Sequence, residues 1–167
     1  MHHFGINSKE AKEELSIINQ KLENLSKELH DTLIIVIADH GQVDTKTIIL
    51  KNDLPDIYNL LERTTSLEAR ACGMKLKSDV SHEEFKELFN KHLKEDFICL
   101  SPEEVIKFKL FGENDNNYLR DTIGDYLLIG ITNKAINYDE TSPIFIGNHA
   151  GLTKDELLVP LIIIECK

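Results

Sequence analysis

Asp39, His40 and Gly41 directly follow the apolar run Leu33–Ala38 and form the first segment of the chain that could support chemistry. A carboxylate and an imidazole are standard ligands of Zn²⁺, and they also suit Mn²⁺. In open α/β sheets, functional groups gather just beyond the carboxyl ends of strands. A glycine at this point would let the backbone turn away beneath a bound ion. On these three residues alone, a polar turn leaving a strand explains the pattern equally well.

Two further histidine segments lie far away in the sequence. His149 is followed by Gly151 and precedes a second apolar run, so it too could lie near the end of a sheet. A lone loop histidine is, however, more often solvated or structural than a ligand. His2 and His3 open the chain, where a tag remnant or a frayed terminus is the alternative explanation. Together, the three segments favour metal-dependent phosphoryl transfer.

Helices and strands must position these residues. Ser8 can cap a helix whose apolar residues follow alternating steps of four and three: Ala11, Leu15, Ile18, Leu22, Leu25 and Leu29. The helix leads into the run Leu33–Ala38, whose lack of alternation predicts a strand covered on both faces. Capping signals predict further helices that begin after Ser81, Ser101 and Thr153.

The middle of the chain carries shorter patterns. We predict strands at Thr47–Leu50, Ser66–Leu76 and Phe97–Leu100, a short helix at Leu54–Leu61, a polar loop at Gly112–Asn117, and a hairpin formed by Tyr126–Ile131 and Ala135–Tyr138. Helices that alternate with buried strands indicate an α/β fold with a parallel or mixed sheet.

Composition and charge exclude several classes of protein. The 41% hydrophobic and 29% charged fractions are those of an ordinary globular protein. A net charge of -10, with no cluster of basic residues, argues against binding to a nucleic-acid backbone. No apolar stretch is long enough to span a bilayer, and the start lacks a signal-peptide layout. The isolated Cys72, Cys99 and Cys166 predict reduced thiols in a cytoplasmic protein.

In three ordered segments, the chain resembles the C-terminal part of the alkaline phosphatase superfamily, in its nucleotide pyrophosphatase/phosphodiesterase branch. The start His2-His-Phe-Gly5 with helix 8–30 resembles Asp-x-x-x-His, an aromatic-Gly pair and a long helix. The segment Asp39-His40-Gly41 matches a strand that ends in Asp-His-Gly. The third segment matches His-x-Gly, Thr-x-x-Glu and a Val-Pro-apolar strand through His149, Gly151, Thr153, Glu156, Val159 and Pro160.

The resemblance implies an alkaline-phosphatase-like fold, with a mixed or parallel sheet flanked by helices. It implies core elements at residues 1–61 and 146–167, with an inserted α+β substrate or cap subdomain at about 62–145. It also implies two divalent metal ions, usually zinc, with Asp39 and His40 holding one ion and His2 and His149 the other.

The family's nucleophile and its first metal-binding aspartate match nothing in this chain and would lie upstream of Met1. Thr45 and Thr47 match no family motif, so no residue is nominated as a nucleophile. We therefore expect the chain to be a C-terminal fragment that is inactive as it stands. We also expect it to self-associate through the surface that truncation would expose.

Three functions stay open. The first is part of a phosphodiesterase or nucleotide pyrophosphatase that acts on a phosphate ester or nucleotide. The second is a phosphatase or metal-dependent phosphomutase of the same superfamily. The third is a non-catalytic α/β interaction module in which the histidines are incidental. Arg63 and Arg70 could contact a substrate phosphate, although solvated faces explain them equally well.

Overall fold

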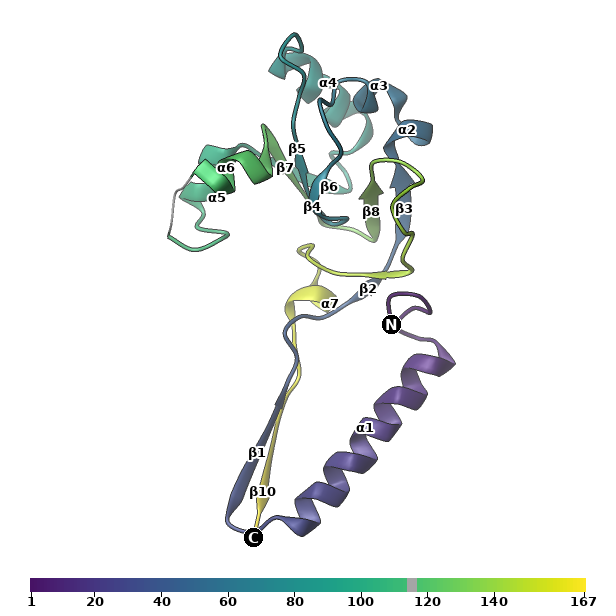
Figure 1. The fold of residues 1–167 in the computed structure, drawn as a ribbon, viewed down its shortest axis with the longest axis vertical. Coiled ribbons are helices and arrows are strands. Elements are labelled where there is room, and N and C mark those ends of the chain that lie inside the picture. Colours follow the sequence, from purple (N-terminus) through teal and green to yellow (C-terminus); the bar gives the residue numbers. More distant parts are fainter. Residues whose placement is uncertain (114–116) are drawn as a thin grey trace.

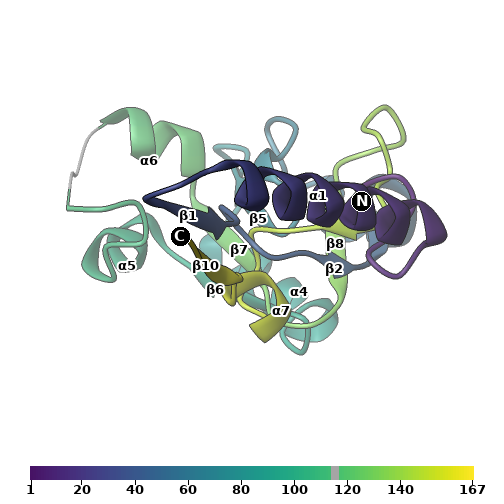
Figure 2. The ribbon, with the colours of Figure 1, turned by 90° about the horizontal axis from the view of Figure 1, so that it is seen from below.

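The computed structural model describes residues 1–113 and 117–167, and its lower part is formed by one long helix and a two-stranded ribbon (Figure 1). Helix α1 (Lys9–Glu28) begins at Ser8, whose hydroxyl accepts a hydrogen bond from the Ala11 N–H, as predicted. Strand β1 (Thr32–Ile37) pairs antiparallel with β10 (Leu161–Cys166). Helix α1 contacts β10, and the two converge at the lower end of the molecule (Figures 1 and 2).

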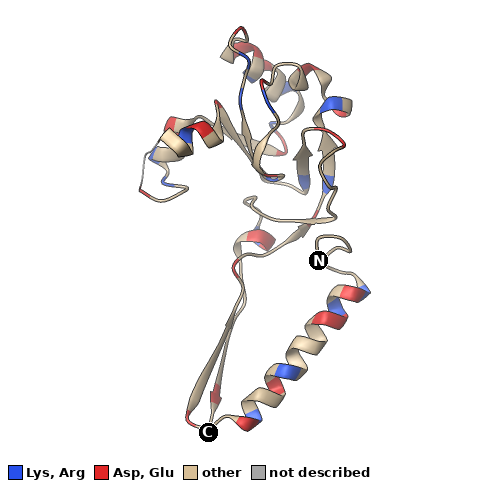
Figure 3. Ribbon diagram, viewed as in Figure 1, with Lys and Arg blue, Asp and Glu red and all other residues tan. Residues whose placement is uncertain are grey.

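The prediction that the run Leu33–Ala38 is covered on both faces is wrong for this chain by itself. The exposed fractions of Leu33, Ile35 and Ile37 are 57%, 58% and 65%, and those of Leu161 and Ile163 on β10 are 63% and 59%. Within the described residues, β1 has β10 as its only partner strand, and a single ribbon cannot cover its own faces. The ribbon is almost free of charged residues (Figure 3).

Two strand pairs connect the ribbon to the upper part of the molecule. Strand β2 (Val43–Asp44) pairs antiparallel with β9 (Gly147–Asn148), and β3 (Lys46–Ile49) pairs parallel with β8 (Lys134–Asn137). Two short helices follow β3, namely α2 (Leu50–Asp53) and α3 (Pro55–Tyr58). In the parallel pair, β3 belongs to the segment that we assigned to the core and β8 to the segment that we assigned to the insertion. The division into a core and an inserted subdomain, near residues 62 and 145, therefore stays a prediction.

The upper part is built on a four-stranded antiparallel sheet in the order β4-β5-β7-β6. Its strands are β4 (Ser66–Glu68), β5 (Ala71–Met74), β7 (Tyr126–Gly130) and β6 (Phe97–Leu100). The helices near it are α4 (His82–His92), α5 (Pro102–Lys107) and α6 (Asn117–Ile123), while α7 (Lys154–Leu157) follows the last loop before β10.

The central strand β7 divides the core into two clusters. Tyr126 and Leu128 point into the larger one, where the Tyr126 ring stacks on Phe85 of α4 at 4.7 Å between ring centroids. Leu127 and Ile129 point into the smaller one, beneath α5 and α6. The strand covered on both faces is therefore β7 rather than β1, because alternate residues of β7 meet helices on opposite sides.

Several local predictions are confirmed and others need correction. The capping box of Ser101 and Glu104 is present at the start of α5, and the side chain of Ser81 caps α4. The single strand predicted at Ser66–Leu76 is instead the hairpin of β4 and β5. The predicted hairpin of residues 126–138 is wrong, because β7 and β8 belong to different sheets. Of the predicted loop at residues 112–117, residues 114–116 lie outside the described part, and Asn117 begins α6.

Among the described residues, no helix is both long enough and apolar enough to cross a bilayer.

Candidate metal centre

Three segments that are distant in sequence converge where the ribbon meets the upper part. His40 follows β1, and His149 follows β9, which pairs with β2 so that Val43 lies opposite Asn148. The N-terminal segment joins them because the N–H groups of Ile146 and Gly147 both donate to the His2 carbonyl, at 2.8 and 3.1 Å. Backbone pairing therefore brings His2, His40 and His149 to one place.

The three imidazole rings are in direct contact. The rings of His40 and His149 stack with 3.8 Å between centroids and an interplanar angle of 18°. The rings of His2 and His149 meet edge-on at 5.5 Å. The carboxylate of Asp39 is exposed, accepts a 3.1 Å hydrogen bond from the His40 N–H, and lies 3.7 Å from His40 Nε2. All four residues predicted as metal ligands are thus neighbours, although their role as ligands stays a prediction.

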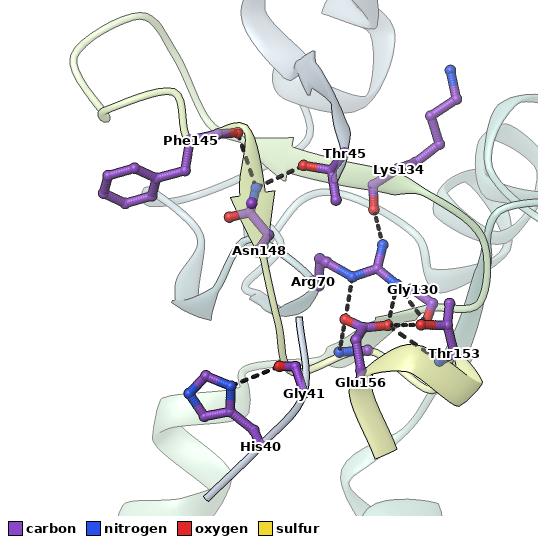
Figure 4. Close-up of polar contacts among 12 residues, drawn as sticks. His40, Gly41, Thr45, Arg70, Gly130, Lys134, Phe145, Asn148, Thr153 and Glu156 are labelled. Atoms are coloured by element: carbon purple, nitrogen blue, oxygen red, sulfur yellow. Dashed lines mark hydrogen bonds and ion pairs between the residues drawn. The ribbon is translucent and has the colours of Figure 1, made fainter. Parts of the chain in front are cut away.

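The hydrogen bond of His40 fixes which of its ring nitrogens is free. His40 Nδ1 lies 2.7 Å from the Gly41 carbonyl (Figure 4). A carbonyl oxygen only accepts, so His40 Nδ1 carries the proton, and in the neutral ring its Nε2 keeps the lone pair. Metal-binding histidines commonly have this arrangement, with the second nitrogen donating to a carbonyl. His2 Nδ1 lies 2.7 Å from the Gly147 carbonyl and 3.2 Å from the Gln42 amide nitrogen, and these two neighbours favour opposite tautomers of His2.

His149 is held toward its neutral, metal-binding form. Burial lowers the pKa of His149, and the neighbouring His40 lowers it further. The donor set of three imidazoles and one carboxylate is chemically suited to Zn²⁺ or Mn²⁺. Within the described residues, no three acidic, histidine or cysteine side chains are yet arranged around a common point that could hold an ion.

A buried ion pair, which the sequence did not reveal, supports the His149 loop. Arg70 is fully buried and donates through Nε and Nη2 to the two carboxylate oxygens of Glu156, with 2.6 Å for the Nη2–Oε2 pair (Figure 4). Glu156 Oε1 also accepts from the Gly151 N–H at 2.8 Å, and Oε2 accepts from the N–H and hydroxyl of Thr153. This carboxylate therefore fixes the turn that follows His149.

The remaining donors of Arg70 also stay within the protein. Nη1 donates to the Lys134 carbonyl and Nη2 to the Gly130 carbonyl. Neither of our alternatives for Arg70, a solvated face or a substrate phosphate, is correct, because the side chain is enclosed and its donors are occupied. Arg63 lies at the surface with its guanidinium against Asp121. The capping signal pointed to Glu156, but no local pattern pointed to its partner 86 residues away.

Gly41 is required for a close backbone approach rather than for the sharp turn that we expected. A Cβ atom added at Gly41 would lie 1.9 Å from the carbonyl oxygen of Asp155, at the start of α7. The Gly41 N–H donates to the Glu156 carbonyl at 2.9 Å. Any side chain at position 41 would therefore push the His40 segment away from the His149 loop.

Comparisons with known proteins identify a family and similar folds. The family described as type I phosphodiesterase / nucleotide pyrophosphatase matches residues 1–151. No curated protein sequence matches. Human ectonucleotide pyrophosphatase/phosphodiesterase 5 superimposes with a TM-score of 0.67 at 19% identity, over 97% of this chain and 43% of its own. Phosphonoacetate hydrolase from Sinorhizobium meliloti 1021, in complex with phosphonoformate, gives 0.66 at 20% identity, over 98% and 43%.

The chain spans less than half the length of these solved structures, and at such identities they show the fold alone. They confirm a mixed α/β fold that corresponds to part of the fold of these two proteins. Because the family match covers most of the chain, the protein belongs to the type I phosphodiesterase / nucleotide pyrophosphatase family.

Proposed function

We propose that this chain supplies the His2, Asp39, His40 and His149 side chains of a two-metal centre in a phosphodiesterase- or pyrophosphatase-type hydrolase. The observation that carries the proposal is the contact of three imidazoles from three distant segments beside one carboxylate. The contact between His40 Nδ1 and the Gly41 carbonyl also supports the proposal, because metal-binding histidines commonly donate from their second nitrogen to a carbonyl.

Each residue has a distinct part in the proposal. Asp39 and His40 are the ligands of one ion, and His2 and His149 are the ligands of the other, with Zn²⁺ favoured over Mn²⁺. When bound, such ions stabilise the attacking and leaving oxygens of a phosphoryl group. The carbonyl of Gly41 orients the His40 ring by binding its Nδ1, which leaves Nε2 available to an ion. No residue of the chain is assigned as the nucleophile.

A phosphate ester or a nucleotide is the proposed class of substrate. Murine ectonucleotide pyrophosphatase/phosphodiesterase 5, solved in complex with AMP as an inactive variant, superimposes on this chain with a TM-score of 0.66 at 17% identity. The negative charge of the whole chain does not oppose such a substrate, because bound cations invert the local field.

Zinc binding tests the proposal directly. The 167-residue chain and its His149→Ala and His30→Ala variants are dialysed against zinc, and bound metal is measured by mass spectrometry and calorimetry. His30 is a matched control, because it lies at the other end of the ribbon with its Nδ1 near the Lys167 carbonyl. We expect His149→Ala to weaken zinc binding at least about tenfold, since even indirect supports of a metal site have effects of this size.

Equal zinc binding by the wild-type and His149→Ala chains, with both variants folded, would contradict the proposal. A second measurement addresses the nucleophile. We expect the chain by itself, loaded with zinc, to leave a nitrophenyl phosphodiester unhydrolysed. Rapid zinc-dependent hydrolysis by the pure chain would show that the chain is active as it stands, contrary to this expectation.

A further inference from the structure

A pocket of about 200 Å³ lies beside the imidazole cluster and has no role in the metal centre. We call it the Phe145 pocket. Its polar lining comes from the loop before and within β4, from the end of β8 and from β9: Thr64, Thr65, Glu68, Asn137, Ser142 and Asn148. Phe145 borders both places, because the residue lines the pocket and its ring lies 5.1 Å from the ring of His2. A ligand held by the metal centre could therefore extend into this pocket.

Two buried amides line the pocket. Asn137 and Asn148 are each only 7% exposed. The Asn148 NH₂ group donates to Thr45 Oγ1 at 2.6 Å and to the Phe145 carbonyl at 3.0 Å, and its oxygen points away from both (Figure 4). The Asn137 NH₂ group donates to the Pro143 carbonyl at 3.3 Å. Because the protein itself uses these donors, the amide oxygens are left as acceptors.

The charge of the lining residues also favours a ligand that donates hydrogen bonds. Glu68 is the only charged side chain among the lining residues, which include no lysine, arginine or histidine. The nearby Arg70 cannot supply positive charge to a ligand, because its donors are occupied by Glu156 and by backbone carbonyls. Two amide oxygens and one carboxylate favour a ligand that donates hydrogen bonds, and an anionic group would meet repulsion from Glu68.

We infer that the Phe145 pocket binds the alcohol part of the substrate, as a non-anionic group rich in hydrogen-bond donors. Two sources share this chemistry: an amino alcohol with an ammonium group, and an uncharged polyol such as a sugar. Phe145 would contact either one, and it adds cation–π attraction for an ammonium. The inference rests on the proposed function, in which the phosphate of the same ester lies at the metal centre. It excludes a second phosphate or a carboxylate from the pocket.

Titration of the ¹⁵N-labelled chain with three small probes tests the inference. The probes are ethanolamine, myo-inositol and glycolate, which represent an amino alcohol, a polyol and an anion. We expect saturable shifts of the Thr64 and Thr65 backbone amides and of the Asn137 and Asn148 side-chain amides with ethanolamine, with myo-inositol or with both, and none with glycolate. Ethanolamine alone would identify an amino alcohol as the source, and myo-inositol alone a polyol.

A conservative variant separates a binding role from a structural one. Glu68→Gln keeps the shape of the exposed side chain, and we expect it to weaken ethanolamine binding about threefold to tenfold, since charge-assisted hydrogen bonds are stronger than neutral ones. It should leave myo-inositol binding within about twofold. Glu62→Gln is the matched control, because Glu62 is an exposed carboxylate nearby that does not line the pocket.

Failure of this inference can be told apart from failure of the proposed function. Tight zinc binding that His149→Ala abolishes, with no probe shifting the four pocket residues, would overturn the inference alone. Glycolate binding as strong as that of ethanolamine would also overturn it. In the supporting outcome, the phosphate ester of whichever probe binds, phosphoethanolamine or a myo-inositol phosphate, binds the zinc-loaded chain at least tenfold more tightly than the probe itself does. His149→Ala removes that gain but not the shifts caused by the probe. Probe shifts without any such gain would refute the proposed metal centre.

Discussion

Replacing Arg70 by methionine should destabilise the protein more than any change to its surface charges. The substitution removes the partner of a buried carboxylate, and it leaves the Lys134 and Gly130 carbonyls without the guanidinium. Glu156 keeps only the Gly151 N–H and the two Thr153 donors. Breaking a buried pair by removing one partner costs about 3–5 kcal/mol.

This energy corresponds to a large shift in the thermal midpoint. For a chain of this length, about 1 kcal/mol shifts Tm by about 2–4 °C, so Arg70→Met should lower Tm by about 6–20 °C. The double variant Arg70→Met/Glu156→Met should be less damaged than the sum of the single variants, because apolar replacement of the whole pair leaves no uncompensated charge. Lys51→Ala is the exposed control, since the 3.3 Å pair of Lys51 and Glu140 lies at the surface, and it should leave Tm unchanged.

The pH dependence gives an independent check on the same pair. Burial alone would raise the pKa of Glu156, but hydrogen bonds from Arg70, Thr153 and Gly151 outweigh it and hold the pKa below its ordinary value of 4.5. The carboxylate therefore adds stability above about pH 4.5, and this stability is lost as the pH falls through the lower folded-state pKa. The difference in the free energy of unfolding between wild type and Glu156→Gln should be largest at neutral pH and should decrease in acid.

Circular dichroism melts of the five variants (Arg70→Met, Glu156→Met, the double variant, Lys51→Ala and Glu156→Gln), repeated between neutral pH and mild acid, measure both effects. A midpoint for Arg70→Met within about 2 °C of the wild type would correspond to only about 1 kcal/mol and would refute the reasoning. A stability gap for Glu156→Gln that stays constant with pH would show that the Glu156 carboxylate is not the group responsible.

Three further outcomes follow from other parts of the molecule. Ser101→Ala removes a capping hydroxyl that accepts from the Glu104 N–H at 3.3 Å. It should lower the free energy of unfolding in urea by about 1 kcal/mol, and an unchanged urea midpoint would show that the cap contributes nothing. Ile35→Lys and Ile163→Lys each place a charge on the exposed ribbon and should reduce self-association in sedimentation experiments. Equal association of the wild type and both variants would exclude the ribbon as the contact surface. Burial raises the pKa of Cys72 to about 12, so its thiol should resist alkylation at pH 8 until the chain is unfolded in urea, and rapid labelling of the folded chain would contradict its burial.

The exposed ribbon shows how a strand's composition and its surroundings can disagree. Strand β1 has the uninterrupted apolar sequence of a buried strand, yet its side chains alternate between exposed and half-buried. Strand β7 has a similar composition and is buried throughout. The difference lies in what packs on each strand, because β7 has a neighbouring strand on either side and helices on both faces, whereas β1 has a single neighbouring strand among the residues that the structure describes.

The sequence by itself determined the features that depend on residues close together in the chain. The start of α1 at Ser8 and the start of α5 at Ser101 were predicted correctly, because a capping side chain acts within three residues. The order of the three histidine segments indicated the family, because the spacing of a motif is a property of the sequence alone.

Only the tertiary structure decided the contacts between distant residues. It brought His2 to the Gly147 carbonyl, 145 residues away, and Arg70 to Glu156, 86 residues away. It also assigned β7 and β8 to different sheets, although a three-residue gap between two apolar runs is typical of a hairpin. Such contacts depend on how whole elements pack and on which backbone groups remain to be paired, and no short window of residues contains that information.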